Sequence, residues 1–104
     1  MLLLLLACAG PDPCDAFCEV AAEAQAACLA SWDLEWSAAG YEDQEDYVAS
    51  CQTWAWEQRL LAKDAGRSTS VVSTACEEHQ LEVEQGGCEA LTAIDWEQPV
   101  WESE

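Results

Sequence analysis

Basic residues are almost absent from this chain. It has 3 Lys and Arg against 21 Asp and Glu among 104 residues, which gives a formal net charge of −18. Nucleic-acid binding depends on Lys and Arg side chains that neutralise phosphates, so this balance argues against nucleic acid as a partner. An anionic membrane surface would repel the chain as well, so we expect any attachment to a membrane to come from acyl chains.

Long apolar runs and strand patterns are also lacking. Residues 2–6 are five leucines, whereas a membrane-spanning helix needs about 20 apolar residues. No alternation of apolar and polar residues extends far enough to predict a strand. With 51% hydrophobic residues and 6 Trp, the chain is also too apolar for a disordered acidic tail. These absences favour an all-α fold in one small domain.

A single histidine limits the chemistry that the chain can perform, because a nucleophilic triad needs a base beside Ser or Cys. His79 follows Cys76 by three residues. A Cys-x-x-His metal pair for zinc or copper, completed by Cys14 or Cys18, is one hypothesis. A partly buried histidine beside a disulfide is the other, and we favour it. We therefore expect no enzyme, no metal site and no cofactor.

The first residues carry a recognisable motif. Leu5-Leu6-Ala7-Cys8 resembles the lipobox of bacterial lipoproteins, in which apolar and small residues precede a cysteine. The resemblance implies that the Cys8 thiol takes a diacylglyceryl group and that the chain is cut just before it. Residues 1–7 would then be a signal peptide and residues 8–12 a lipid tether. Ala9 resembles the residue after the cysteine in lipoproteins that are sent to the outer membrane.

No Lys or Arg precedes the leucines, and their run is shorter than the usual signal core of about seven residues. A start upstream of Met1 and a weak signal both stay open. A secretory signal without lipid and an apolar N-terminus of a cytosolic protein are the alternatives to lipidation.

The remaining cysteines predict a disulfide framework. Setting Cys8 aside leaves six of the 7 cysteines: Cys14, Cys18, Cys28, Cys51, Cys76 and Cys88. An even number in a small exported chain is typical of disulfides that supplement a small core. Cys14 and Cys18 lie one helical turn apart, so each should reach another helix. Among the arrangements that stay open, we favour Cys28–Cys51, Cys18–Cys76 and Cys14–Cys88.

Amphipathic patterns predict three to four short helices in an up-down-up bundle over residues 13–96. The first starts at Pro13, capped by Asp12, and ends at Gly40 or near Ser31. The second ends at Gly66. The third ends at Gly86 and Gly87, with one or two further turns up to about residue 95. Residues 97–104 are expected to be a polar tail.

The tryptophans divide into two groups. Trp32, Trp36 and Trp54 lie on apolar stripes and are expected in the core. The other three tryptophans, with Leu60, form a candidate patch for a protein or glycan partner, because exposed aromatic residues often mark binding sites. The patch consists of Trp56, Leu60, Trp96 and Trp101. Packing of Trp96 and Trp101 over Trp56 or over the bundle end is the equal alternative.

The sequence thus predicts a lipid-anchored protein of the bacterial cell envelope with a non-enzymatic binding or structural role. A Cys/His metal-binding or redox domain is one alternative. A secreted, inhibitor-like disulfide-rich domain without lipid is the other.

Overall fold

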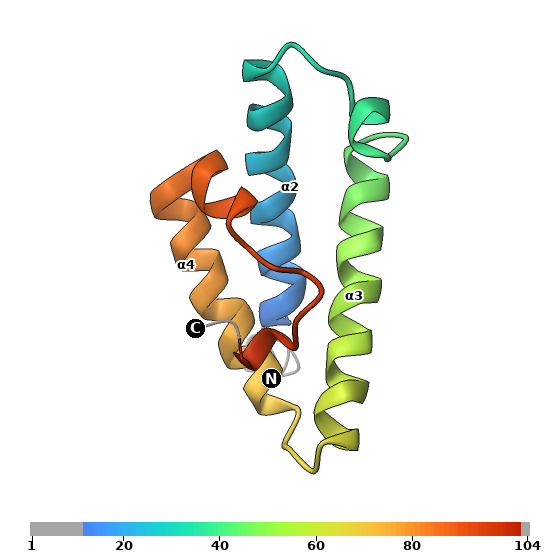
Figure 1. Cartoon of the computed structure of the whole chain (residues 1–104), viewed down its shortest axis with the longest axis vertical. Helices are drawn as coiled ribbons and strands as arrows, with labels where there is room; N and C mark the ends of the chain where they lie inside the picture. The colour runs from blue at the N-terminus through green and yellow to red at the C-terminus, as the bar shows by residue number, and fades with distance from the viewer. Residues whose placement is uncertain (1–11, 103–104) are drawn as a thin grey trace, which may run out of the picture.

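The structure, a computed structural model, describes residues 12–102. Within that range it has three α-helices, α2 (Pro13–Ser31), α3 (Gln44–Asp64) and α4 (Ser70–Thr92), and two short 3-10 helices, η1 (Trp36–Ala39) and η2 (Val100–Glu102). α2 and α4 run in one direction and α3 in the other, and α2 packs most extensively against α4 (Figure 1). No strand occurs in the described part of the chain. The predicted all-α, disulfide-stapled, up-down-up bundle is confirmed.

Helix α2 begins where the sequence predicts and ends at the earlier of the two predicted stops. Asp12 Oδ1 accepts the Cys14 N–H at 2.7 Å and thereby caps the helix, and Pro13 occupies its first turn. Aspartate is a preferred residue at the cap, and proline is a preferred residue at the first helical position. After Ser31 the backbone turns, and Asp33 has a φ of 57°. The apolar stripe therefore ends there, and Trp32, expected in the core, is 49% exposed. That expectation was wrong because it assumed that the helix continues.

Helix α3 places one face against α2. Asp43 caps its start by accepting the Asp46 N–H at 2.8 Å. Gly66 ends the helix region with a φ of 75°, and the Arg67 N–H then reaches back to the Ala62 carbonyl at 2.8 Å. This left-handed closure favours glycine, as the sequence predicts.

Helix α4 bends at Gly87, whose φ of 61° and ψ of −137° are not helical. The last turns, up to Thr92, therefore point away from the main axis of the helix (Figure 1). A Cβ at Gly86 would lie only 2.7 Å from the Ala90 Cβ, so the bend also requires a small residue there. The predicted break at the glycine pair is confirmed.

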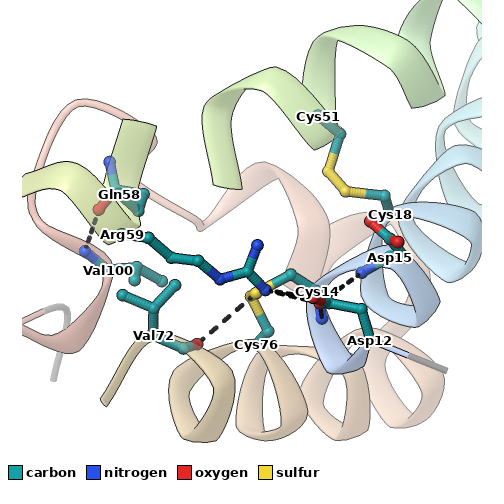
Figure 2. The surroundings of a disulfide bond; sticks show 10 residues. All are labelled: Asp12, Cys14, Asp15, Cys18, Cys51, Gln58, Arg59, Val72, Cys76 and Val100. Atoms are coloured by element: carbon teal, nitrogen blue, oxygen red, sulfur yellow. Dashed lines mark hydrogen bonds and ion pairs between the residues drawn. A yellow bond between two sulfur atoms is a disulfide. The ribbon is translucent and has the colours of Figure 1, made fainter. Parts of the chain in front are cut away.

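Three disulfides join α2 to the other two helices. They are Cys14–Cys76, Cys18–Cys51 and Cys28–Cys88. All six predicted cysteines are therefore paired, but each of the three favoured pairings was wrong. Figure 2 shows the first two bridges, which leave adjacent turns of α2 towards different helices.

The error has a physical cause in the connection between α2 and α3. Pairing Cys28 with Cys51 assumed that α3 starts level with the end of α2. Instead η1 lies beside the upper end of α3 (Figure 1), so α3 begins lower and Cys51 is level with Cys18. Cys28 is then free to meet Cys88 just beyond the Gly87 bend.

The segment after α4 returns along the bundle and packs on it (Figure 1). Val100 is buried, and its N–H donates to Gln58 Oε1 at 2.8 Å (Figure 2). Trp101 is half-buried, with the Arg67 guanidinium 6.0 Å from its ring centroid. Residues 97–102 thus differ from the polar tail that the sequence predicts, because Val100 joins the buried apolar core and η2 packs against α4.

Candidate aromatic binding site

A cavity of about 500 Å³ opens between α2, α3 and the segment that follows α4. We call it the aromatic cavity because two tyrosines and two tryptophans line it. Its described lining consists of Gln25, Ala39, Tyr41, Tyr47, Ser50, Cys51, Trp54, Leu91, Thr92, Ile94 and Trp96. Its size lies in the range of about 300–1,000 Å³ that is usual for small-molecule sites.

Two tyrosines and Trp36 form one end of this region. Tyr47, in the first turns of α3, packs edge-on against Tyr41 with ring centroids 5.0 Å apart and lies 5.6 Å from Trp36. Burial, with a contribution from neighbouring Tyr41, raises the pKa of Tyr47 to about 12. Tyr47 therefore presents a neutral hydroxyl at every physiological pH.

Two tryptophans form the other wall. Trp54 lies two turns after Tyr47 on α3, and its ring meets the Trp96 ring at 4.9 Å in an edge-to-face arrangement. The Trp54 indole N–H donates to the Trp96 carbonyl at 3.1 Å. Trp96 also stacks on Phe17, with centroids 5.8 Å apart. These contacts hold the segment after α4 in place and fix the shape of the wall.

None of the described residues that line the aromatic cavity is charged, although 24 of the 104 residues in the chain are Asp, Glu, Lys or Arg. The lining side chains that carry polar groups are Gln25, Tyr41, Tyr47, Ser50 and Thr92, together with the indoles of Trp54 and Trp96. Such walls offer apolar surface and neutral hydrogen bonds, and they provide no carboxylate or imidazole for acid–base catalysis.

The residues of the predicted partner patch have different surroundings in the structure. Trp56 is 59% exposed and Leu60 is 42% exposed on the outer face of α3. Trp96 packs beside Trp54, and Trp101 lies beside Arg67. Trp54 and Trp56 are two residues apart on one helix, so they point in nearly opposite directions. Trp96 therefore lies away from Trp56 and Leu60, which stay one turn apart on the exposed face of α3.

Cys76 and His79, the predicted metal pair, both make other contacts in the structure. Cys76 is bonded to Cys14, and a disulfide sulfur is not a thiolate ligand. His79 is 7% exposed, and its Nδ1 lies 2.9 Å from Glu82 Oε1. Within residues 12–102, no group of three or more His, Cys, Asp and Glu side chains is arranged to hold a metal ion. The metal hypothesis requires reduced Cys76.

An ion pair joins α3 to the first turn of α2. Arg59 Nη2 lies 2.7 and 2.6 Å from the two carboxylate oxygens of Asp12 (Figure 2). Burial tends to raise the pKa of Asp12, but the Arg59 hydrogen bond, the Cys14 and Asp15 N–H groups and the Arg59 charge together lower it below 3.8. Asp12 thus both caps α2 and fixes the start of the described chain against α3. Cys8, the predicted lipidation site, lies outside the described residues.

The lowered pKa predicts how this pair depends on pH. The charged form of Asp12 stabilises the fold above pH 3.8, and that contribution is lost as pH falls through the lower pKa of the folded state. We expect Asp12→Asn, which keeps the helix cap, to lose at most about 1 kcal/mol near neutral pH. The loss should vanish when urea titrations are repeated from about pH 5 down to about pH 1.

Asp12→Ala serves as the comparison, because it removes the cap and the ion pair together. We expect it to lose about 1 kcal/mol more than Asp12→Asn. Equal losses for Asp12→Asn at neutral and at low pH would contradict the assignment of this pair as an ionic contact.

Comparison with models of protein families, with curated proteins and with solved structures finds no match to this chain. The geometry of the described residues is therefore the basis for a functional proposal. None of the helices within residues 12–102 is both long and apolar enough to cross a membrane.

Sequence reasoning missed the aromatic cavity. Tyr41 and Thr92 carry no signal of a site, because Tyr41 lies in the connection before α3 and Thr92 at the end of α4, and each reaches the cavity only through the tertiary fold. One usable signal was the spacing of Tyr47 and Trp54, which places two aromatic side chains on one face of α3.

Proposed function

We propose that this protein is a lipid-anchored protein of the bacterial cell envelope with a non-enzymatic binding role, and that the aromatic cavity is its binding site. The observation that carries the binding role is a cavity of about 500 Å³ with aromatic walls and no charged lining residue in a chain of net charge −18. Such a site suits an uncharged ligand with an apolar face. The surrounding carboxylates disfavour anions.

The cavity walls are held together before any ligand arrives. Cys51 lines the cavity and is bonded to Cys18 on α2, while Trp96 is fixed by stacking on Phe17 and by the hydrogen bond from Trp54. A preorganised site loses little entropy on binding. This rigidity supports a binding role without a conformational change of the bundle.

The binding site is tested with the uncharged fluorescent probe N-phenyl-1-naphthylamine. Ser50→Phe places a ring at the cavity wall, and we expect it to weaken probe binding at least about tenfold, which corresponds to about 1.4 kcal/mol. Thr53→Phe, on the exposed surface of α3 and outside the cavity lining, is the matched control and should bind as the wild type does. Equal affinity in all three proteins, or no binding to the wild type, would overturn the cavity as the site.

The anchor is supported by the lipobox-like sequence before Cys8 and by the pairing of the other six cysteines. Disulfides persist in oxidising compartments outside the cytoplasm. A diacylglyceryl group supplies the two acyl chains that stable membrane attachment requires. By the same resemblance, Ala9 favours the outer membrane.

The anchor is tested by the intact mass of the native protein from cells, with and without reduction and alkylation. We expect a chain that begins at Cys8, carries acyl mass and alkylates at six thiols only after reduction. A chain that begins at Met1 with thiols that react without reduction would overturn the anchor and revive the Cys76–His79 metal hypothesis. A chain released without acyl mass would favour the secreted alternative.

A further inference from the structure

The start of the described chain lies beside a particular face of α3. In the proposed function Cys8 sits in the membrane, and Asp12 follows it by four residues. A chain of that length spans at most about 14 Å. Arg59 binds the Asp12 carboxylate at 2.6 Å. The side of α3 that carries Arg59 is therefore held within a short distance of the lipid headgroups.

That side of α3 carries a stripe of mostly exposed side chains, which we call the α3 stripe: Trp56, the half-buried Arg59, Leu60 and Lys63. At about 100° per residue these four side chains fall within an arc of about 100°. Trp56 is 59% exposed, Leu60 is 42% exposed and Lys63 is exposed. The buried residues Ala55 and Ala62 flank the stripe on the side of Arg59, and buried Gln58 lies farther round the helix.

The charges of the chain are distributed along its long axis. All three basic residues lie within residues 59–67, together with one acid, Asp64. Residues 33–46 hold six acids, Asp33, Glu35, Glu42, Asp43, Glu45 and Asp46, and no basic residue. These two segments lie at opposite ends of the longest axis of the molecule (Figure 1). The end nearest the tether is thus the one that an anionic lipid surface repels least.

From the short tether, the Asp12–Arg59 pair and this charge distribution we propose that the α3 stripe lies against the phospholipid headgroups and orients the anchored domain. The proposal rests on the lipid anchor of the proposed function. Trp, Leu and Lys together suit the membrane–water interface, because each buries apolar atoms while Lys and Trp keep polar atoms in contact with water. The acyl chains provide the attachment, and the stripe adds contacts at a high effective concentration.

This orientation leaves the binding site open. Tyr47 and Trp54, which line the aromatic cavity, lie roughly opposite the α3 stripe around the axis of α3. The acidic end at residues 33–46 then lies at the end of α3 that is farther from the tether. The domain would present its cavity to ligands in the aqueous phase.

The chain offers a direct reporter, because Lys63 is its only lysine. The lipidated protein, its acyl mass first verified, is inserted into preformed vesicles of phosphatidylethanolamine and phosphatidylglycerol and treated with a membrane-impermeant amine reagent. The rate at which the Lys63 peptide is labelled is compared with that in the Cys8→Ser chain, which has no lipid. We expect labelling of Lys63 to be several-fold slower on vesicles.

The matched control moves the single lysine to the acidic end. In Lys63→Arg/Asp33→Lys the reporter lies at exposed position 33, and we expect the same labelling rate on vesicles as in solution. In lipidated Trp56→Ala/Leu60→Ala, labelling of Lys63 should return towards its rate in solution, whereas Leu81→Ala, at an exposed leucine of α4, should leave the protection intact.

Two outcomes would overturn the proposal while leaving the anchor in place. One is equal labelling of Lys63 on vesicles and in solution by a protein that carries acyl mass. The other is that labelling of Lys63 in the lipid-free chain becomes slower as the protein concentration increases. That result would show that the α3 stripe contacts a second copy of the protein. Absence of acyl mass on Cys8 would instead refute the anchor itself, before any labelling is done.

Discussion

Replacing Cys14 and Cys76 together by alanine should lower the free energy of unfolding by about 4 kcal/mol. This bridge spans 62 residues of sequence, and the loop-closure entropy that a disulfide removes from the unfolded chain increases with that separation. Both half-cystines are fully buried, so their loss also leaves a gap between α2 and α4. A small domain has a net stability of only about 5–15 kcal/mol, so this variant should lose between about a quarter and most of that stability.

Urea titrations followed by far-ultraviolet circular dichroism measure this effect. The double substitution removes both members of the bridge, so neither Cys14 nor Cys76 is left as a free thiol that could exchange with the other two disulfides. The variant Cys18→Ala/Cys51→Ala opens a bridge of 33 residues and should lose somewhat less. A loss below about 1 kcal/mol for Cys14→Ala/Cys76→Ala would show that the bridge is not a major source of stability, since a native disulfide in a small domain typically contributes about 2–5 kcal/mol.

Phe17→Ala should destabilise the protein by about 3–5 kcal/mol. Phe17 is the largest fully buried side chain among the described residues. Its ring lies 6.2 Å from the Trp54 ring, 5.8 Å from the Trp96 ring and 6.0 Å from the His79 ring. One substitution therefore removes contacts to α3, to α4 and to the segment after α4, and the resulting void cannot collapse without moving all three.

The same substitution should disturb the aromatic cavity, because Trp96 loses the ring on which it stacks. We expect the near-ultraviolet circular dichroism of Phe17→Ala to weaken and its affinity for N-phenyl-1-naphthylamine to fall. Phe17→Leu is the control, since it retains most of the buried volume and should lose less than half as much stability. Equal losses in the two variants would mean that the ring contributes little beyond its first carbons.

Features encoded by neighbouring residues could be predicted from the sequence. Asp12 and Pro13 specify the start of α2, Gly66 specifies the end of α3, and Gly87 marks the bend in α4. In each case the local backbone conformation depends on the side chain present, so no knowledge of the tertiary structure is needed.

The disulfide pairing depended on helix register, which the sequence encodes less directly. A usable signal was nevertheless present. Cys14 and Cys28 are 14 residues apart and Cys76 and Cys88 are 12 apart, so two parallel helices can join both pairs at once. The favoured pairing was inconsistent with these spacings. It joined Cys88 to Cys14, whereas Cys88 lies at the other end of α2, beside Cys28.

The positions of the tryptophans were the least predictable feature. Trp32 belongs to the apolar stripe of α2 by spacing, yet the helix ends one residue earlier. Trp96 and Trp101 lie outside the α-helices and pack against residues distant in sequence: Trp96 against Phe17 and Trp54, and Trp101 against Arg67. Burial of such residues is decided by the assembled bundle, so no local pattern reports it.

The arrangement of the bridges gives α2 a further role. Because α2 is bonded once to α3 and twice to α4, a protease that cuts either interhelical connection leaves all three helices in one covalent molecule. A cut between α2 and α3, or between α3 and α4, therefore leaves every helix covalently attached to the chain before α2. The domain should thus survive a single cut in either connection, and only a reductant acting after such a cut would release a helix.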